Sequence, residues 1–84
     1  MTYSVLVRCV AVKELIKLPD DVYGHVRDSI YELARDPRPL GCVKLSGRHG
    51  WRIRTGDYRV IYDIDEELGN VVISYVGHRK DIYR

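Results

Sequence analysis

The sequence has 84 residues, of which 45% are hydrophobic and 31% are charged, and its formal net charge at pH 7 is +2. A chain of this length is expected to form one small domain, residues 1–84, which buries about 60–65% of the surface that the unfolded chain exposes. Because the sequence has neither a signal-peptide pattern nor an apolar run long enough to span a bilayer, we expect a cytoplasmic protein with no membrane partner.

The cysteines and histidines do not form a recognisable ligand set. Three histidines and two cysteines are scattered along the chain without the paired spacing of zinc ligands. We therefore expect neither a metal site nor a cofactor. Cys9 and Cys42 have no C-x-x-C spacing, which favours two reduced thiols that act as small buried hydrophobic residues.

The first half of the chain predicts a strand followed by two helices. Alternating apolar residues predict a strand from Tyr3 to Cys9. Apolar residues at helical spacing then predict a short helix that ends at Pro19, and a longer helix follows up to Asp36. The buried stripe of the longer helix is expected at four positions: Val22, Val26, Ile30 and Leu33.

The second half predicts the rest of the sheet. Residues 42–45 favour a short strand, residues 65–70 an acidic turn, and the apolar run 71–76 a strand inside the sheet. The order of the elements predicts an α+β fold, β-α-α-β-β-β, in which a helical hairpin packs on one face of a mostly antiparallel sheet.

Residues 51–62 contain the most informative pattern, two alternating runs on either side of Gly56-Asp57. This pattern predicts a β-hairpin whose tight turn has glycine at its first central position. If the loop holds only these two residues, Arg54 pairs with Arg59. The apolar residues of both strands are then expected on one face of the hairpin, and Arg52, Arg54 and Arg59 on the other.

The positive charge is concentrated in the same region. Residues 1–43 carry six basic and six acidic residues, residues 44–59 five and one, and residues 60–84 three and five, which gives net charges of 0, +4 and −2. Because like charges directly opposite each other destabilise a hairpin, the paired arginines indicate a site for a polyanion. A local cluster suits a specific phosphate-bearing site better than nonspecific wrapping of nucleic acid. The alternative is a solvated, charged strand face.

Two motifs follow each other in this half of the chain. The pattern R-x-G-D-Y-R-φ-φ-Y, in which φ is apolar, matches Arg54 to Tyr62, and G-H-R-x-x-x-Y matches Gly77 to Tyr83. Together with residues 13–19, 36–39 and 44–45, these motifs resemble the RelE/ParE toxins of bacterial and archaeal toxin–antitoxin modules. The resemblance covers essentially the whole chain, and the combination of the two motifs is specific.

The resemblance implies a RelE-like fold and, for the RelE branch, a ribosome-dependent mRNA endonuclease. Such toxins cut mRNA in the ribosomal A site, and a cognate RelB-like antitoxin wraps the toxin in a hetero-oligomer and silences it. The ParE branch shares this fold but acts on DNA gyrase without nuclease activity. It is the alternative, together with a family member of weakened activity.

The resemblance also assigns site residues. The family's basic catalytic positions correspond to Arg52, Arg54, Arg59 and Arg79, and its functional C-terminal tyrosine corresponds to Tyr83. Guanidinium groups bind phosphate oxygens bidentately and stay charged, which suits the negative charge that develops when the 2′-hydroxyl attacks the adjacent phosphate. Tyr83 could stack on or orient a base. Further RNA contacts are expected from four residues: Lys44, Arg48, His78 and Lys80.

The resemblance does not assign a general base that would remove the proton of the 2′-hydroxyl. Arginine is effectively never deprotonated in proteins, whereas several relatives have lysine at the positions of Arg52 and Arg54. One alternative is that the arginines act electrostatically and ribosomal RNA or substrate geometry contributes more. The other is a different base, for which His49 and His78 are candidates because histidine titrates near neutrality.

Overall fold

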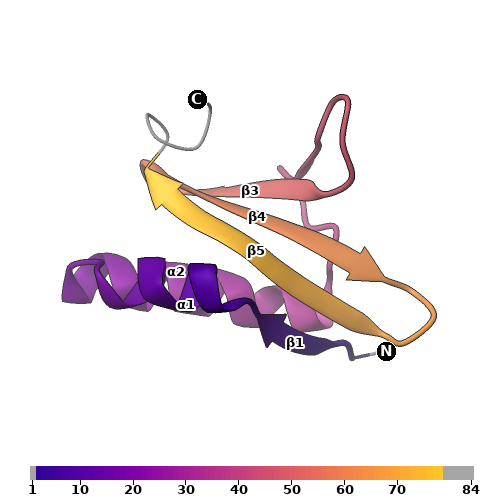
Figure 1. The fold of residues 1–84 in the computed structure, drawn as a ribbon, viewed down its shortest axis with the longest axis horizontal. Helices are drawn as coiled ribbons and strands as arrows, with labels where there is room; N and C mark the ends of the chain where they lie inside the picture. The colour runs from indigo at the N-terminus through magenta and orange to yellow at the C-terminus, as the bar shows by residue number, and fades with distance from the viewer. Residues whose placement is uncertain (1, 79–84) are drawn as a thin grey trace.

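Two helices cover one face of a five-stranded sheet (Figure 1). The structure is a computed structural model that describes residues 2–78. In chain order the elements are β1 (Ser4–Val7), α1 (Cys9–Ile16), α2 (Asp20–Arg35), β2 (Val43–Lys44), β3 (Trp51–Thr55), β4 (Tyr58–Asp65) and β5 (Asn70–His78). The predicted α+β fold is confirmed. In the described part of the chain, neither helix is long and apolar enough to cross a membrane.

The sheet is mostly antiparallel, as predicted. Its strand order is β1-β5-β4-β3-β2, with β1 parallel to β5 and the other three pairs antiparallel. The two helices connect β1 to the rest of the sheet, which is the long crossover that a parallel pair of strands requires. The apolar run 71–76 belongs to β5, which lies inside the sheet between β1 and β4.

The hairpin of β3 and β4 has the predicted register. Arg54 is paired with Arg59, and Arg52 with Ile61. Gly56 has φ +61°, whereas no residue other than glycine has a positive φ in the described chain, so Asp57 has a negative φ. Positive φ at the first central position alone defines a type II′ turn, whose twist matches that of the flanking strands.

The hydrophobic core lies between α2 and the sheet. Val26, Ile30 and Leu33 are buried along one side of α2, and Val22 is partly buried beside them, which confirms the predicted stripe. Burying one such side chain stabilises a fold by about 1.5–3 kcal/mol. The remaining buried core residues come from α1 and from the three long strands: Ala11, Ile53, Val60, Tyr62, Val71, Ile73 and Val76.

The junction of β1 and α1 differs from the prediction. The strand ends at Val7, Arg8 keeps an extended backbone (φ −67°, ψ 153°), and Cys9 begins the helix. Cys9 is consequently exposed on the first helical turn, so its predicted burial is wrong, while Cys42 is partly buried. The sequence pattern predicted a strand up to Cys9 because Cys9 continues the apolar alternation of that strand.

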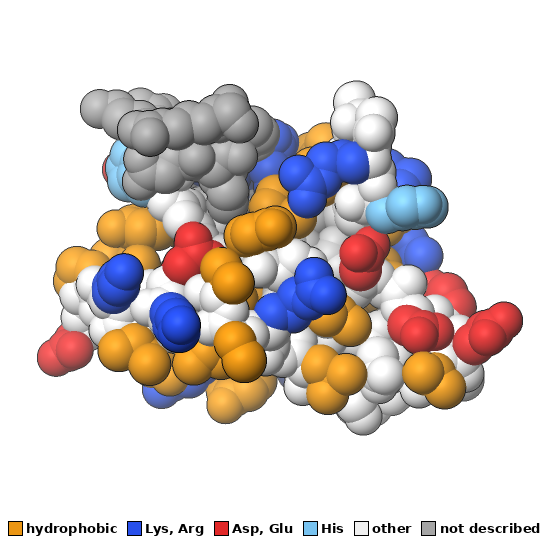
Figure 2. Space-filling model, in the orientation of Figure 1, with side chains coloured by type: hydrophobic (Ala, Val, Ile, Leu, Met, Phe, Trp, Pro, Cys, Tyr) orange, Lys and Arg blue, Asp and Glu red, His pale blue; other side chains and the backbone are white. Residues whose placement is uncertain are grey.

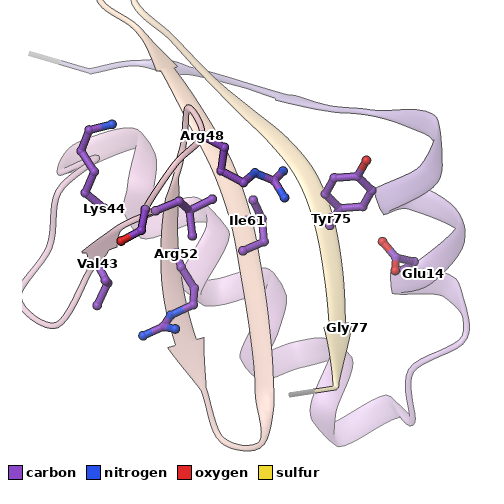
Figure 3. Close-up of a pocket in the computed structure, with 10 residues that line it drawn as sticks. Glu14, Val43, Lys44, Arg48, Arg52, Ile61, Tyr75 and Gly77 are labelled. Carbon is purple, nitrogen blue, oxygen red and sulfur yellow. The ribbon is translucent and has the colours of Figure 1, made fainter. Parts of the chain in front are cut away.

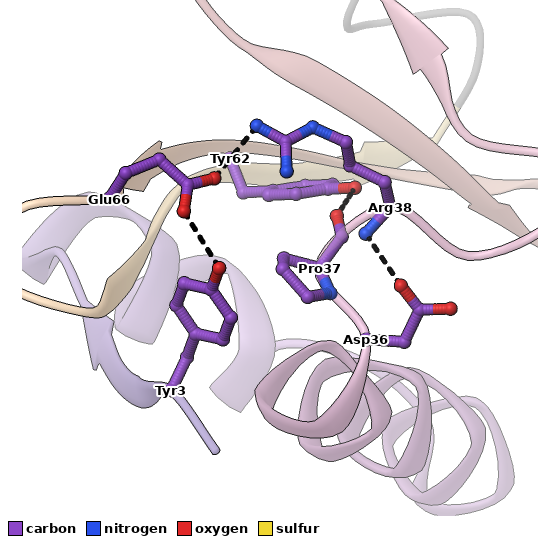
Figure 4. A network of polar contacts seen from close by, with 6 residues as sticks. All are labelled: Tyr3, Asp36, Pro37, Arg38, Tyr62 and Glu66. Carbon is purple, nitrogen blue, oxygen red and sulfur yellow. Dashed lines mark hydrogen bonds and ion pairs between the residues drawn. The ribbon is translucent and has the colours of Figure 1, made fainter. Parts of the chain in front are cut away.

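A polar network fixes the connection that follows α2 (Figure 4). The hydroxyl of the buried Tyr62 donates a hydrogen bond to the Pro37 carbonyl oxygen at 2.7 Å. Arg38 forms an ion pair with Glu66 at 2.9 Å, and the Tyr3 hydroxyl donates a hydrogen bond to the same carboxylate at 2.8 Å. The chain start, the connection after α2 and the β4–β5 turn are thereby joined.

The Glu66 carboxylate makes part of this stability dependent on pH. The hydrogen bond from Tyr3 and the charge of Arg38 lower the pKa of Glu66 below its ordinary value. A carboxyl group with a lowered folded-state pKa stabilises the fold above its unfolded-state pKa, and this contribution disappears as the pH falls through the folded-state pKa. We therefore expect Glu66→Gln to lower the melting temperature near neutral pH, with a difference from wild type that vanishes in acid.

Thermal melting across an acid series, monitored by circular dichroism, measures this difference. Glu67→Gln is the matched control, because Glu67 is the exposed neighbouring residue. A difference between Glu66→Gln and wild type that stays constant over the whole series would contradict the expectation.

Candidate nucleic-acid interface

The hairpin arginines lie on the sheet face opposite the helices. Ile53 of β3 is buried in the core, so its neighbours Arg52 and Arg54 point to the other side of the sheet. Arg59 shares this face because it is paired directly with Arg54. The register therefore gathers the three arginines on one face, as predicted.

The directly paired arginines differ in exposure. Arg54 is exposed, whereas Arg59 is only 5% exposed, and its Nη1 donates a hydrogen bond to the Tyr58 carbonyl oxygen at 3.4 Å. Charge–charge interactions strengthen as the surrounding dielectric falls. A phosphate at this pair would meet one solvated cation and one shielded cation.

A groove of 560 Å³ runs across the same face (Figure 3). Its lining includes Lys44, Arg48 and Arg52, together with the apolar surfaces of Ile61 and Tyr75. Figure 3 shows Arg48 pointing across β4 toward Tyr75. Cationic side chains beside an exposed aromatic ring suit a single-stranded nucleic acid, which offers both phosphates and bases that can stack.

The connection between β2 and β3 covers part of this face. Ile61 is paired with Arg52 and lies on the arginine face, yet it is only 6% exposed. The prediction that all apolar residues of the hairpin share one face is therefore wrong for Ile61. The connection is closed by a hydrogen bond from the Leu45 N–H to the Gly50 carbonyl oxygen at 3.0 Å. It places Arg48 over β4.

Tyr75 reaches the groove because β5 contains a bulge. Tyr62 is paired with Ile73 and Ile61 with Tyr75, so Ser74 is an extra residue. A bulge shifts the alternation of side chains by one position. Tyr75 is consequently 43% exposed, while the next residue, Val76, is buried. Sequence reasoning missed this residue because adjacent apolar side chains do not reveal where the phase changes.

Glu14 also lines the groove and was missed. It comes from α1, and its Oε1 accepts a hydrogen bond from the Val76 backbone N–H at 2.9 Å. The pairing of β1 with β5 ends at Val7 and Ile73, so this N–H lies beyond the end of β1. The carboxylate supplies the acceptor that a neighbouring strand would otherwise provide.

We expect Glu14→Ala to lower the free energy of unfolding by about 1–2 kcal/mol, because a partly buried N–H loses its acceptor. Urea unfolding followed by circular dichroism measures the loss. Glu14→Gln is the matched variant, since its amide oxygen can accept the same hydrogen bond, and it should recover most of the stability. Equal losses in the two variants would mean that the charge of Glu14, not the hydrogen bond, is stabilising.

The predicted peripheral contacts are dispersed. The Lys44 Nζ lies 5.4 Å from the centroid of the Trp51 ring, although the residue also lines the groove. His78 is paired with Tyr58, and the two rings meet edge to face at 5.4 Å. Because Tyr58 is in phase with the core residue Val60, this contact places His78 on the helix side of the sheet. The predicted roles of Lys44 and His78 in RNA binding stay predictions.

The second motif falls largely beyond the structure. Arg79, Lys80 and Tyr83 lie outside the described residues. Within residues 2–78, no three His, Cys, Asp or Glu side chains are grouped so that they could hold a metal ion.

Charge is separated along the molecule. Figure 2 shows acidic side chains gathered around the β4–β5 turn, where the sequence has Asp63, Asp65, Glu66 and Glu67. The paired arginines flank the β3–β4 turn, at the other end of β4. The resulting field favours approach of a polyanion to the arginine end.

Family and sequence comparisons cover the full fold. The protein-family model described as the ParE toxin of the type II toxin–antitoxin system, parDE, matches residues 7–83. Toxin RelG of Mycobacterium tuberculosis is 38% identical over 88 residues, which cover 100% of this chain and 99% of RelG. Toxin RelE of the same organism is 31% identical over 86 residues, which cover 98% of this chain and 87% of RelE.

Solved structures show the same arrangement. The toxin–antitoxin complex RelBE2 of M. tuberculosis contains a chain with a TM-score of 0.84 and 32% identity, covering 94% of this chain and 100% of that one. The archaeal RelE–RelB complex of Pyrococcus horikoshii gives a TM-score of 0.84 and 31% identity, with 96% and 99% coverage. A mutant Escherichia coli RelE in the free state gives 0.82 and 26%, with 98% and 88% coverage.

Proposed function

The chain belongs to the RelE/ParE family of toxins from type II toxin–antitoxin systems, and from this premise we propose that it is a RelE-like, ribosome-dependent mRNA endonuclease that inhibits translation. The observation that carries the proposal is the arrangement of Arg52, Arg54 and Arg59 on one sheet face. A groove that Arg52 and Tyr75 line runs across the same face. This combination of fixed cations and an exposed ring matches the phosphates and bases of single-stranded mRNA.

The proposed reaction uses the nucleophile that RNA carries. The 2′-oxygen passes its proton to water and bonds to the adjacent phosphorus, the bond from phosphorus to the 5′-oxygen breaks, and the leaving 5′-oxygen takes up a proton from water. Arg54 and Arg59 stabilise the negative charge on the non-bridging phosphate oxygens. Arg52 holds the neighbouring backbone phosphate. Arg79 and Tyr83, which lie outside the described residues, are assigned to the same reaction by the family resemblance alone.

Proton removal is the step for which the arginines are unsuited. His78 packs against Tyr58 on the helix side of the sheet, away from the three arginines. We therefore assign the arginines an electrostatic role and assign alignment of the 2′-hydroxyl to the ribosomal A site. Because the ribosome would align the 2′-hydroxyl, cleavage would depend on the ribosome.

Purified toxin incubated with mRNA, in the presence and absence of programmed ribosomes, tests this function. Primer extension should map cuts within codons of ribosome-bound mRNA and none in free mRNA. Intact mRNA on ribosomes at toxin concentrations that arrest growth would overturn the proposal.

A gyrase-directed toxin is the second candidate, because the matching family model is that of ParE toxins. A supercoiling assay with DNA gyrase distinguishes it. Inhibited supercoiling without any loss of mRNA would establish the ParE-like function.

We also propose a RelB-like antitoxin as the partner, in a toxin–antitoxin hetero-oligomer. Two of the similar structures described above, RelBE2 of M. tuberculosis and RelE–RelB of P. horikoshii, are toxin–antitoxin complexes. Ribosomes and mRNA as targets would place the toxin in the cytoplasm. Co-expression with the product of the adjacent reading frame should relieve growth arrest and yield a complex on gel filtration.

A further inference from the structure

Two rows of side chains cross the open face of the sheet. One row consists of three paired residues: Arg52, Ile61 and Tyr75. The next row, toward the β3–β4 turn, consists of Arg54, Arg59 and Gly77. Residues two positions apart on a strand share a face and lie about 6.6 Å apart. Tyr75 is therefore only one row away from the arginine pair that we assign to the scissile phosphate, a separation that one nucleotide of an extended strand can span.

The Glu14 carboxylate lies at the end of the groove where Tyr75 projects. Figure 3 shows it beside β5, next to the Tyr75 ring. Its Oε1 accepts the hydrogen bond of the Val76 N–H at 2.9 Å, and this peptide group directly follows Tyr75. In the part of the chain that the structure describes, the second carboxylate oxygen has no hydrogen-bond or ion-pair partner. One oxygen is thus held by the backbone, and the other is left for a ligand.

A negative charge in a groove for RNA needs a reason. Lys44, Arg48 and Arg52 line the same groove and attract phosphates, whereas the Glu14 carboxylate repels them. Accepting the hydrogen bond of a backbone N–H requires only an oxygen, which an uncharged glutamine would supply without that repulsion. The carboxylate instead favours one orientation of a bound nucleotide. Its phosphate faces the cations, and its base faces β5, where Tyr75 offers a ring for stacking.

The hydrogen-bonding capacity of a carboxylate determines which base fits beside it. An ionised carboxylate only accepts hydrogen bonds, through two adjacent oxygens. Guanine presents two adjacent donors on its Watson–Crick edge, N1–H and the N2 amino group. On the same edge of adenine, cytosine and uracil, every donor lies directly beside acceptors on both sides or on its one neighbouring position, and a carboxylate repels these acceptors. Guanine alone therefore forms a bidentate pair with a carboxylate.

We infer that Glu14 and Tyr75 form a base-specificity subsite, in which Tyr75 stacks on one base of the bound mRNA and the Glu14 carboxylate selects guanine there. This inference rests on the proposed mRNA endonuclease function. The hydrogen bond from the Val76 N–H holds the carboxylate in place before the base arrives, so little side-chain freedom is lost on binding. Because Glu14 contacts the base and not the phosphate, it determines which codons are cut and not the chemistry of the cut.

Cleavage of a set of mRNAs on programmed ribosomes tests the selection. The mRNAs differ only in the A-site codon, where each position carries G, A, C or U in turn, and kcat/KM is measured for each. At one position, guanine is expected to be cut about 10- to 100-fold more efficiently than the other bases, the discrimination typical of one bidentate base contact. Inosine, which keeps N1–H but lacks the N2 amino group, should fall between guanine and adenine at that position.

Glu14→Gln is the decisive variant. Its amide oxygen keeps the hydrogen bond with the Val76 N–H, and its amide nitrogen places a donor beside that acceptor. One acceptor next to one donor is the pattern that pairs with adenine. The variant should therefore cut the adenine codon about tenfold more efficiently than the guanine codon. Glu67→Gln removes an equal charge from the exposed β4–β5 turn and should keep the preference for guanine.

Variants of Tyr75 separate stacking from selection. Tyr75→Ser removes the ring and should lower kcat/KM about tenfold for all codons alike, because a base stacks on any aromatic ring whatever its edge. Tyr75→Phe keeps the ring and should cut at the wild-type rate. Tyr75 is 43% exposed, so both variants are expected to fold, and circular dichroism checks that they do. A loss in Tyr75→Ser confined to guanine codons would contradict the assigned stacking role.

Two results would overturn the inference while mRNA is still cut: a wild type without base preference, and an identical preference in Glu14→Gln, which would assign codon selection to the ribosome. Binding of short RNAs separates this failure from failure of the proposed function. Isotope-labelled toxin is titrated with oligouridines that contain one guanine or one adenine, and the Val76 amide resonance is followed. A shift specific to guanine in wild type and to adenine in Glu14→Gln supports the subsite even without cleavage, which would overturn the nuclease function alone. Absence of both cleavage and a shift would overturn both.

Discussion

Replacing Arg54 by alanine is expected to lower the rate of ribosome-dependent mRNA cleavage by about 100-fold, the effect typical of removing one preorganised group that stabilises developing charge. Arg54 is exposed on the open face and is paired with the shielded Arg59. A scissile phosphate held between these two arginines would lose one of its two cationic contacts in the hairpin. Single-turnover cleavage at saturating ribosome concentration measures the effect on the chemical step.

The same substitution should not destabilise the fold. Like charges directly opposite on neighbouring strands destabilise a hairpin by about 0.2–1 kcal/mol, and removal of one arginine relieves that repulsion. We therefore expect the melting temperature of Arg54→Ala to equal or exceed that of wild type. Lower activity together with unchanged or higher stability is the signature of a residue kept for function.

Two further variants make this result specific. Arg54→Lys keeps the charge but loses the planar fork that binds phosphate through two hydrogen bonds, so its cleavage rate should fall between those of alanine and arginine. Arg35→Ala removes an equally long, largely exposed arginine from α2 and should leave cleavage unchanged. A wild-type rate in Arg54→Ala, or a parallel loss of stability, would contradict the assigned role.

The hairpin register could be predicted because short-range rules determine it. Alternation assigns each side chain of a strand to a face, and a two-residue turn containing Gly56 fixes which residues are paired. Arg54 and Arg59 are five residues apart in the sequence, on either side of that turn, so their pairing depends on no distant segment. The stripe of α2 was predictable for the same reason, since helical periodicity is local.

The groove could not be predicted because distant segments form it. Tyr75 points into it only through the extra residue Ser74, and Glu14 enters from α1 to reach the Val76 amide. Ile61 is buried because an irregular connection folds over it. A bulge and a long-range hydrogen bond leave no periodic signal in the sequence. The positions of the arginines on the sheet face were thus predictable, whereas the other residues that line the groove were not.

Gly50 lies in the connection between β2 and β3, and its substitution tests whether this connection positions Arg48 and the groove. Its φ is +121°, a conformation that side chains rarely adopt. A Cβ at this position would lie 3.2 Å from both the Leu45 Cδ1 and the Tyr62 carbonyl oxygen. The Leu45 side chain can rotate, but the Tyr62 backbone belongs to β4 and is held by the sheet. The connection, with Arg48 on it, would have to move instead.

We therefore expect Gly50→Ala to lower the free energy of unfolding by about 2–3 kcal/mol, from backbone strain combined with the close contact. Its cleavage rate should fall as well, because Arg48 no longer lies over β4. Urea unfolding and single-turnover cleavage measure the two effects.

Gly47→Ala is the matched control. Gly47 belongs to the same connection and also has a positive φ, +70°, but a Cβ there meets no atom within 4 Å. Both substitutions restrict the unfolded chain to the same extent, so the difference between them isolates the contact with β4. Gly47→Ala should lose only about 1 kcal/mol, the strain of a left-handed conformation. Equal losses of stability and activity in the two variants would show that the packing of Gly50 on β4 does not position the groove.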